Sequence, residues 1–176
     1  FTFATAAAGG PLPAWLGYDP QTATFSGTPA NADVGTLDVA ITAIDTGGAS
    51  VTESFSIMVA NSNDAPLLAN PLPDQTGREQ QAFVFTVPEA TFADVDRGDV
   101  LAYAADLENG DPRPGWLGFD AAQRRFSGTP GLTDSGRYRL RVTATDAAGA
   151  AAADVFELTV ADSGGVGQTL IGTAGD

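Results

Sequence analysis

A phrase of seventeen residues occurs twice in this chain and constrains its fold more than any other feature. Residues 13–29 read PAWLGYDPQTATFSGTP, and residues 114–130 read PGWLGFDAAQRRFSGTP. The similarity runs without a gap from 13–61 to 114–162, where 20 of 49 positions are identical at an offset of 101 residues. A period of about 100 residues is too long for a solenoid unit and is typical of independently folded modules in tandem.

Apolar residues alternate with polar or smaller residues through most of both copies. The clearest runs are 36–45, 53–61, 82–87, 137–146 and 154–162. A period of two predicts strands with one buried face, and the Gly, Pro, Asn and Asp clusters between the runs predict turns. No stretch combines a helical period with caps. The pattern predicts an all-β sandwich in each copy.

The repeated phrase itself reads as a hairpin of two short strands. Trp15, Leu16 and Phe25 are predicted core anchors, and Gly27 ends the hairpin. An exposed Trp can also stack on a sugar ring, but both copies place the Trp in the same apolar setting, which favours the core.

The first copy has fewer residues ahead of its repeated phrase than the second copy has. This difference predicts three segments in the chain. Residues 1–65 are expected to be a module that lacks its N-terminal strand or strands, and 66–162 a complete module. Residues 163–176 are expected to be a Gly-rich linker.

The composition excludes several kinds of site. The chain has no Cys and no His, so it has no disulfides, no thiolate or imidazole metal ligands, and no Cys–His or Ser–His catalysis. A formal net charge of −14 argues against nucleic acid and suits a surface that attracts divalent cations. No apolar run approaches the ~20 residues of a membrane span.

Three groups of acidic and amide residues could bind calcium, which prefers hard oxygen ligands. Asn61, Asn63 and Asp64 lie between the modules, 94–99 carries three Asp residues, and Asp146 lies in a turn after a predicted strand. Taken singly, each group is more typical of a turn than of a set of metal ligands. Together, in so acidic a chain, they predict a calcium site.

These motifs resemble those of cadherins. NSNDAP at 61–66 resembles the cadherin linker, Asp94-x-Asp96 resembles its Asp-x-Asp pair, and TATDAAG at 143–149 resembles its Ala-x-Asp-x-Gly turn. The run from Trp15 to 48 is closer still to bacterial dystroglycan-type cadherin-like modules, also described as Ig-type He_PIG repeats of large secreted proteins. The resemblance implies a tandem of Greek-key immunoglobulin/cadherin-like β-sandwiches with about seven strands each.

The resemblance also implies calcium sites at module junctions. Carried over by position, the ligands of the junction site are Asn61, Asn63, Asp64, Asp94, Asp96, Asp146 and, from the first module, Asp33. The Asp-Arg-Glu loop of cadherins is absent, so the share of the first module is open. A possible second metal site at the other end of the second module comprises Glu79, Asp134 and Asp162.

The tail GGVGQTLIGTAGD resembles the entry to RTX nonapeptide repeats, with Gln168 where Asp is expected. We assign no metal to it. This resemblance implies a large RTX-type bacterial protein, exported by type I secretion and located outside the cell or on its surface.

The second copy alone carries a row of Arg residues. Arg137, Arg139 and Arg141 alternate along one predicted strand, and Arg124 and Arg125 lie in the hairpin. Guanidinium groups suit carboxylates and sulfates, so this face could bind acidic polysaccharide. The alternative, which we favour, is a solvated face paired with the module's own carboxylates.

Two functions follow. The leading one is a non-catalytic, calcium-binding module pair that acts in adhesion or as a calcium-rigidified spacer, with other modules of the same protein, surface polysaccharide or homophilic contacts as partners. The alternative is a carbohydrate-binding accessory of a polysaccharide-degrading enzyme or matrix protein. A catalytic role is the weakest, because the carboxylates lie at turns and a junction.

Overall fold

The computed structural model describes residues 1–7, 10–96 and 98–164, and it is all-β. The chain forms two compact units. The first comprises Phe1–Asp64 and Val95–Gly98, and the second comprises Ala65–Asp94 and the residues from Asp99 onward. Tandem all-β sandwiches are therefore the fold, as the sequence predicts. The predictions for 165–176, including the one for Gln168, lie outside the described residues.

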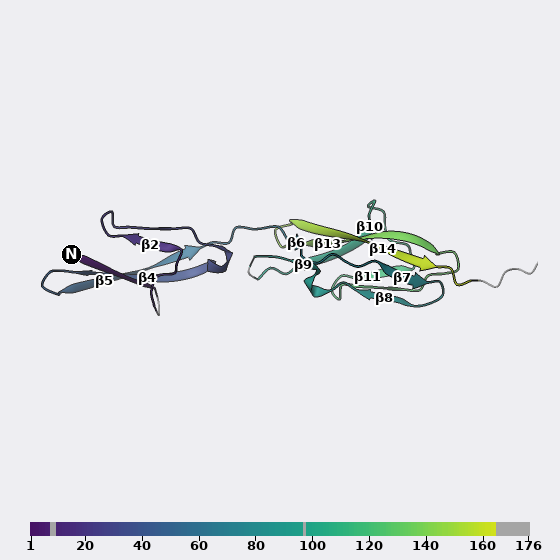
Figure 1. The fold of residues 1–176 in the computed structure, drawn as a ribbon, viewed down its shortest axis with the longest axis horizontal. Coiled ribbons are helices and arrows are strands. Elements are labelled where there is room, and N and C mark those ends of the chain that lie inside the picture. Colours follow the sequence, from purple (N-terminus) through teal and green to yellow (C-terminus); the bar gives the residue numbers. More distant parts are fainter. Residues whose placement is uncertain (8–9, 97, 165–176) are drawn as a thin grey trace, which may run out of the picture. The chain divides into compact units, whose positions relative to one another are not determined.

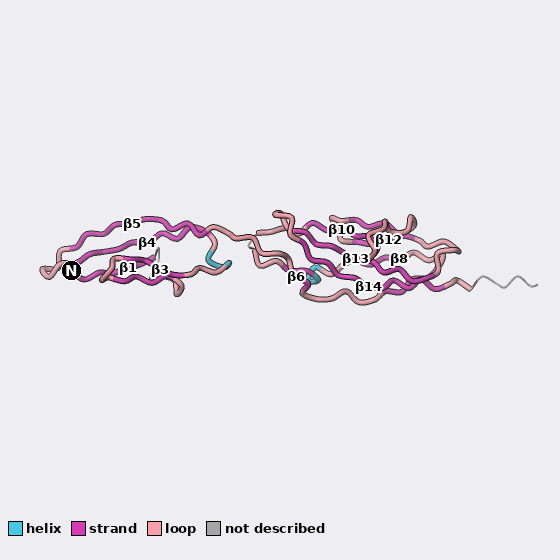
Figure 2. The backbone as a smooth tube through the Cα atoms, turned by 90° about the horizontal axis from the view of Figure 1, so that it is seen from above, coloured by secondary structure: helices cyan, strands magenta, loops and turns pink. Residues whose placement is uncertain are grey.

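The first unit contains five described strands. They are β1 (Thr2–Ala7), β2 (Leu16–Asp19), β3 (Thr24–Gly27), β4 (Gly35–Ile44) and β5 (Ser50–Val59). An antiparallel sheet has the order β1-β4-β5, and β2 and β3 form a hairpin across from it (Figures 1 and 2). A 3-10 turn at Asn31–Asp33 leads into β4.

The second unit contains nine described strands. They are β6 (Leu67–Leu68), β7 (Gln75–Arg78), β8 (Phe83–Thr86), β9 (Phe92–Ala93), β10 (Ala102–Leu107), β11 (Leu117–Asp120), β12 (Arg125–Gly128), β13 (Gly136–Thr145) and β14 (Ala151–Ala161), with a 3-10 turn at Glu89–Thr91. One sheet has the order β10-β13-β14-β7 and the other β11-β12-β8, and β6 pairs with β9. Seven strands in two sheets, plus one short pair, match the predicted sandwich (Figure 1).

The two copies of the repeat form equivalent strands. β1 to β5 correspond to β10 to β14, and the registers repeat as well. Leu16 pairs with Gly27 as Leu117 pairs with Gly128, and β4–β5 pairs over ten residues as β13–β14 does. Within the described residues, the first unit has no counterpart of β6 to β9.

The second unit closes over a continuous apolar core between its sheets. Alternate residues of β13 and β14 supply much of it, and Phe83 and Phe126 come from the facing sheet. Phe126, Leu140 and Leu158 are fully buried. Trp116 packs against this core, edge-on to Tyr138 at a centroid distance of 5.9 Å, which agrees with the predicted role of the repeated Trp.

The core of the first unit is more open. Its buried apolar residues, among those described, are Leu16 and Val39. Phe55 of β5 is 39 % exposed, whereas its counterpart Phe156 is 2 % exposed. The apolar alternation is the same in both strands, so the difference arises from what covers them. No described helix is long and apolar enough to cross a bilayer.

Candidate metal centre

Three carboxylates of the second unit converge at one end of its sandwich. Asp94 follows β9, Asp99 precedes β10, and Asp146 follows β13. One oxygen atom from each lies within 4.8 Å of the others. Asp94 and Asp99 lie in one loop, and Asp146 follows β13, whose end pairs antiparallel with the start of β10.

A tight turn holds Asp146 in place. Its backbone N–H donates to the carbonyl of Ala150 at 2.9 Å, and its Oδ1 accepts from the Ala150 N–H at 2.8 Å. Gly149 has φ of +93°, a value that Gly adopts without strain. The side chain is only 6 % exposed. The carboxylate is therefore held in a fixed position by local backbone chemistry.

The donor set fits a hard divalent cation. Carboxylate oxygens are ligands that calcium prefers, and about six to eight oxygens complete its shell. Like charges this close repel one another, and a bound cation would reverse the sign of that interaction. Asp94, Asp99 and Asp146 could supply three ligands of such a shell.

Asp99 was not among the predicted ligands, although its acidic segment was. The signal was present in the sequence as a third Asp in 94–99. Gly98, with φ of +96°, redirects the chain just before Asp99. The Asp-x-Asp pattern predicts Asp94 and Asp96 as ligands and does not include Asp99.

Asp96 makes a different contact. It is 5 % exposed, and its Oδ2 accepts the backbone N–H of Asp64 at 2.7 Å. The carboxylate of Asp64 accepts from the Asn31 amide at 2.7 Å. Both contacts lie within the first unit, which includes Val95–Gly98. The side chain of Asp96 thus fixes the backbone of the linker motif.

The remaining predicted ligands of the first unit serve local structure or lie at the surface. Asn63 donates to the carbonyl of Asp64 at 3.1 Å, and Asn61 is exposed. Asp33 accepts the N–H of Ala30 at 2.9 Å, just as Asp134 accepts the N–H of Gly131 at 2.7 Å in the second unit. The matched pair of Asp residues therefore stabilises the same turn in both copies.

Glu79, Asp134 and Asp162 do not form a second group of converging carboxylates among the described residues. Glu79 is 2 % exposed, and its carboxylate accepts from the backbone N–H groups of Ser135 and Ser163 at 3.1 and 3.0 Å. The pKa of Glu79 is lowered, chiefly by the hydrogen bond from the Ser163 backbone. Asp162 accepts the N–H of Gly164 at 2.8 Å. The three carboxylates each anchor a different piece of backbone.

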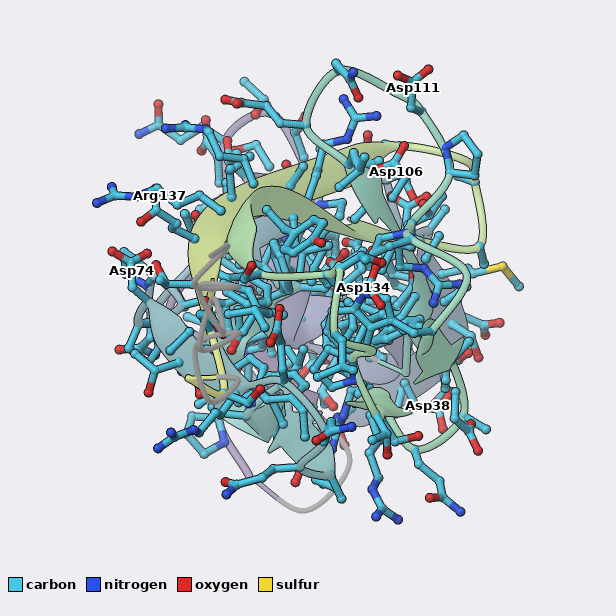
Figure 3. The ribbon with its side chains drawn as sticks, turned by 90° about the vertical axis from the view of Figure 1, so that its right-hand side faces the viewer. Asp38, Asp74, Asp106, Asp111, Asp134 and Arg137 are labelled. Atoms are coloured by element: carbon cyan, nitrogen blue, oxygen red, sulfur yellow. The ribbon has the colours of Figure 1, made fainter. Side chains whose placement is uncertain are left out.

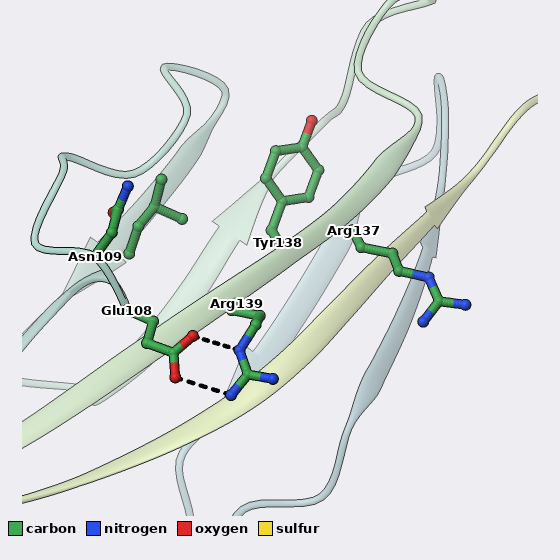
Figure 4. Close-up of a pocket in the computed structure, with 6 residues that line it drawn as sticks. Glu108, Asn109, Arg137, Tyr138 and Arg139 are labelled. Carbon is green, nitrogen blue, oxygen red and sulfur yellow. Dashed lines mark hydrogen bonds and ion pairs between the residues drawn. The ribbon is translucent and has the colours of Figure 1, made fainter.

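The Arg row of β13 is paired with carboxylates of its neighbours. Arg139 pairs with Glu108 (Figure 4). Arg137 donates to Glu157 on β14 at 3.1 Å, and Arg141 binds Asp106 on β10 through two bonds of 2.9 and 2.5 Å. The guanidinium of Arg141 lowers the pKa of Asp106. Cross-strand ion pairs therefore cover this face, which is the alternative that the sequence favoured.

The hairpin arginines differ from this row. Arg124 lies over the ring of Tyr103 at 5.7 Å and borders a pocket of about 370 Å³ that also contains Asp94 and Asp99. Arg125 is exposed. Figure 3 shows Arg137 and the neighbouring Asp74 at the surface, where they point away from the ribbon. The five Arg residues thus do not form one cationic patch.

Comparisons with solved structures agree with the fold. The first two extracellular cadherin domains of human mucin-like protocadherin match with a TM-score of 0.63 and 15% identity, over 91% of this chain and 84% of that chain. Mouse cadherin-23 domains EC22–24 match with a TM-score of 0.59 and 18% identity, over 91% and 53%. At this identity the likeness shows the fold alone.

A family 107 glycoside hydrolase, the endo-fucoidan hydrolase MfFcnA4, aligns at a TM-score of 0.47 and 22% identity. The alignment covers 91% of this chain and 23% of the hydrolase, so the chain spans about a quarter of that protein, and the score is too low to support an argument. No curated protein matches the chain.

One family model matches nearly the whole described chain. The family, described as "Putative Ig domain", matches twice, at residues 1–60 and 65–161. Each match includes nearly all of one copy of the repeat and falls on one of the two units. The chain therefore belongs to this immunoglobulin-like domain family, as a tandem of two cadherin-like modules.

Proposed function

We propose that this module pair is a non-catalytic, extracellular spacer or adhesion segment whose second unit binds calcium through Asp94, Asp99 and Asp146. The convergence of these three carboxylates within 4.8 Å carries the proposal. The resemblance of the surrounding motifs to those of cadherins, and the cadherin extracellular domains among similar folds, support it further. The other ligands that the sequence predicts for this site stay predictions: Asn61, Asn63, Asp64, Asp96 and Asp33.

Calcium would act here as a cross-link between loops. Asp94 and Asp99 lie in the loop that connects β9 to β10, and Asp146 lies in the turn that connects β13 to β14. Shared ligation of one ion would hold the loop and the turn against each other. Disulfides fill this role in many secreted proteins, but this chain has no Cys. A segment stiffened in this way suits a spacer.

Calorimetry with calcium tests the proposal. At free calcium about 100 times the Kd, linkage adds ~2.7 kcal/mol, which would raise the Tm of a domain of this size by on the order of 10 °C. The double variant Asp94→Asn/Asp99→Asn is expected to lose most of this increase. It should also melt at a higher temperature than the parent in chelator, since two like charges are removed.

The matched control is Asp111→Asn/Asp120→Asn, which removes two exposed carboxylates of the same unit. This control should keep the full response to calcium. Equal calcium-dependent increases in the parent and in the Asp94→Asn/Asp99→Asn variant would contradict the site, and a parent that does not respond to millimolar calcium would contradict the function.

The carbohydrate-binding alternative has one observation in its favour. The side chain of Arg137 is 75 % exposed at the edge of a pocket that Arg139 and Tyr138 also line (Figure 4). An acidic glycan would have to displace Glu157 and Glu108 from these guanidiniums. We therefore expect no retention on a sulfated-glycan column in 0.15 M salt, and retention that Arg137→Ser/Arg139→Ser abolishes would favour this alternative.

A further inference from the structure

An Asn-Gly dipeptide lies in the loop between β10 and β11 of the second unit. Asn109 is the only one of the five Asn residues in the chain that precedes a Gly. Asn109, Gly110 and Asp111 are all exposed. Figure 4 shows Asn109 on this loop next to Glu108, and Figure 3 shows Asp111 pointing away from the ribbon. The side-chain amide of Asn109 is therefore open to water.

The side chain of Asn109 folds back over the backbone that follows it. Its Oδ1 accepts the backbone N–H of Asp111 at 3.0 Å, and its Nδ2 donates to Oδ2 of Asp111 at 2.7 Å. The first of these bonds closes an Asx turn, a small ring that contains both the Cγ of Asn109 and the backbone nitrogen of Gly110. The turn therefore holds the side-chain carbonyl carbon close to that nitrogen.

Gly110 leaves its nitrogen accessible to the Asn109 side chain. Glycine has no Cβ to obstruct the approach, and it adopts the observed φ of +88° without strain. A Cβ at Gly110 would meet nothing within 4 Å among the described residues, so no other described segment covers this position. The Gly110 N–H donates to the Leu107 carbonyl at 2.8 Å within the same exposed turn. Local opening of this bond frees the nitrogen to react.

Asp111 supplies two groups that favour attack on the Asn109 amide. Its backbone N–H polarises the side-chain carbonyl and stabilises the negative charge that develops on Oδ1 when Cγ is attacked. Its carboxylate lies 2.7 Å from Nδ2, the nitrogen that has to leave. The carboxylate can therefore accept the proton of the Gly110 nitrogen and deliver it to the leaving group.

We propose that Asn109 is a site of spontaneous covalent modification, in which the Gly110 nitrogen attacks Cγ. A bond forms between that nitrogen and Cγ, the bond between Cγ and Nδ2 breaks, and Nδ2 leaves as ammonia. Water then opens the five-membered imide at either carbonyl and yields Asp or β-linked isoaspartate. The net reaction consumes one water and releases one ammonia, and it needs no oxidant, cofactor or enzyme.

The modification changes both the charge and the backbone of the loop. Asn109 lines a pocket of about 280 Å³ together with Arg137 and Arg139, so the new carboxylate adds a negative charge beside these guanidiniums. The β-linked product also inserts one carbon into the backbone of the loop that the Leu107 N–H closes on the Asp111 carbonyl at 2.9 Å. The loop therefore changes irreversibly with time, at the pocket that an acidic glycan would have to enter.

Peptide mapping by mass spectrometry of the full 176-residue chain, incubated at 37 °C near neutral pH, measures the reaction. Loss of ammonia should occur at Asn109 at least tenfold faster than at Asn61, which is also exposed but precedes a Ser. Labelling by a protein-isoaspartate methyltransferase should detect the β-linked product. Asn109→Gln should abolish both signals, because its longer side chain does not form the five-membered ring.

Two further comparisons isolate the contribution of the turn. The folded chain should react at least as fast as the synthetic peptide LENGDPR, with the sequence of residues 107–113. Asp111→Ser should slow the reaction several-fold, because it removes the carboxylate and keeps the backbone N–H. Asp120→Ser removes an exposed carboxylate from another turn of the same unit and should leave the rate unchanged.

Each of three results would overturn this inference. Asn109 could react no faster than Asn61, so that it would not be a distinct site. The folded chain could react tenfold or more slowly than LENGDPR, in which case the turn protects the amide. Equal rates in the parent and in Asp111→Ser would remove the role of the Asp111 carboxylate.

Discussion

Several single carboxylates among the described residues accept hydrogen bonds from the backbone and so hold it in place. Glu79 is the clearest case, since it is 2 % exposed and accepts three hydrogen bonds, two from Ser163 and one from Ser135. These donors stabilise the ionised form, and the pKa is therefore lowered. The charge of Glu79 ties the strand β7 to the segments before β13 and after β14.

The lowered pKa of Glu79 predicts an acid-dependent stability. A carboxyl group whose pKa is lower in the folded than in the unfolded state stabilises the folded state. Its full contribution is present at a pH above the unfolded-state pKa, near 4.5, and it is lost as the pH falls through the folded-state pKa. We expect the free energy of unfolding of the parent chain to fall more steeply below pH 4.5 than that of Glu79→Gln. Urea titrations between pH 6 and 3 in calcium-free buffer check this, and parallel curves would contradict it.

At the scale of elements, the repeated hairpin depends on one close backbone approach. In both copies the glycine that ends the hairpin lies against the carbonyl of the Trp: a Cβ would sit 1.8 Å from the Trp15 oxygen at Gly27 and 1.9 Å from the Trp116 oxygen at Gly128. The neighbouring atoms are backbone and cannot rotate away. Packing therefore requires glycine at this position in both copies.

Gly128→Ala is accordingly expected to destabilise the second unit by about 2 kcal/mol or more, since the backbone of β11 has to shift. Gly115→Ala is the matched control, because a Cβ at Gly115 meets nothing within 4 Å. Guanidinium denaturation followed by Trp fluorescence measures the difference, and similar midpoints for the two variants would refute the packing argument.

At the scale of the whole molecule, the two units differ in how completely their cores are covered. Phe126 is fully buried, and its counterpart Phe25 is half-buried. Hydrophobic stabilisation scales with the apolar area removed from water, so the first unit is expected to be the less stable one. We expect two unfolding transitions, with the first unit melting at the lower temperature.

A matched pair of substitutions tests this difference. Phe126→Ala should lower the stability of the second transition by about 3–5 kcal/mol, and Phe25→Ala should lower that of the first by less than half as much, because less area is lost. Differential scanning calorimetry assigns each loss to its transition. Equal losses, or a single transition that both variants shift alike, would contradict independent units with unequal cores.

Local patterns in the sequence determined the strands, the hairpins and the tandem arrangement of this protein, because alternation, turn residues and a gapless repeat are properties of neighbouring residues. They also identified Asp94 and Asp146 as candidate ligands. The tertiary structure alone decided which carboxylates converge. It brought Asp99 to them and engaged Asp96 with the Asp64 backbone, since convergence depends on where distant loops meet. It alone also showed that the same apolar strand is buried as β14 and exposed as β5, because burial depends on the strands that cover it.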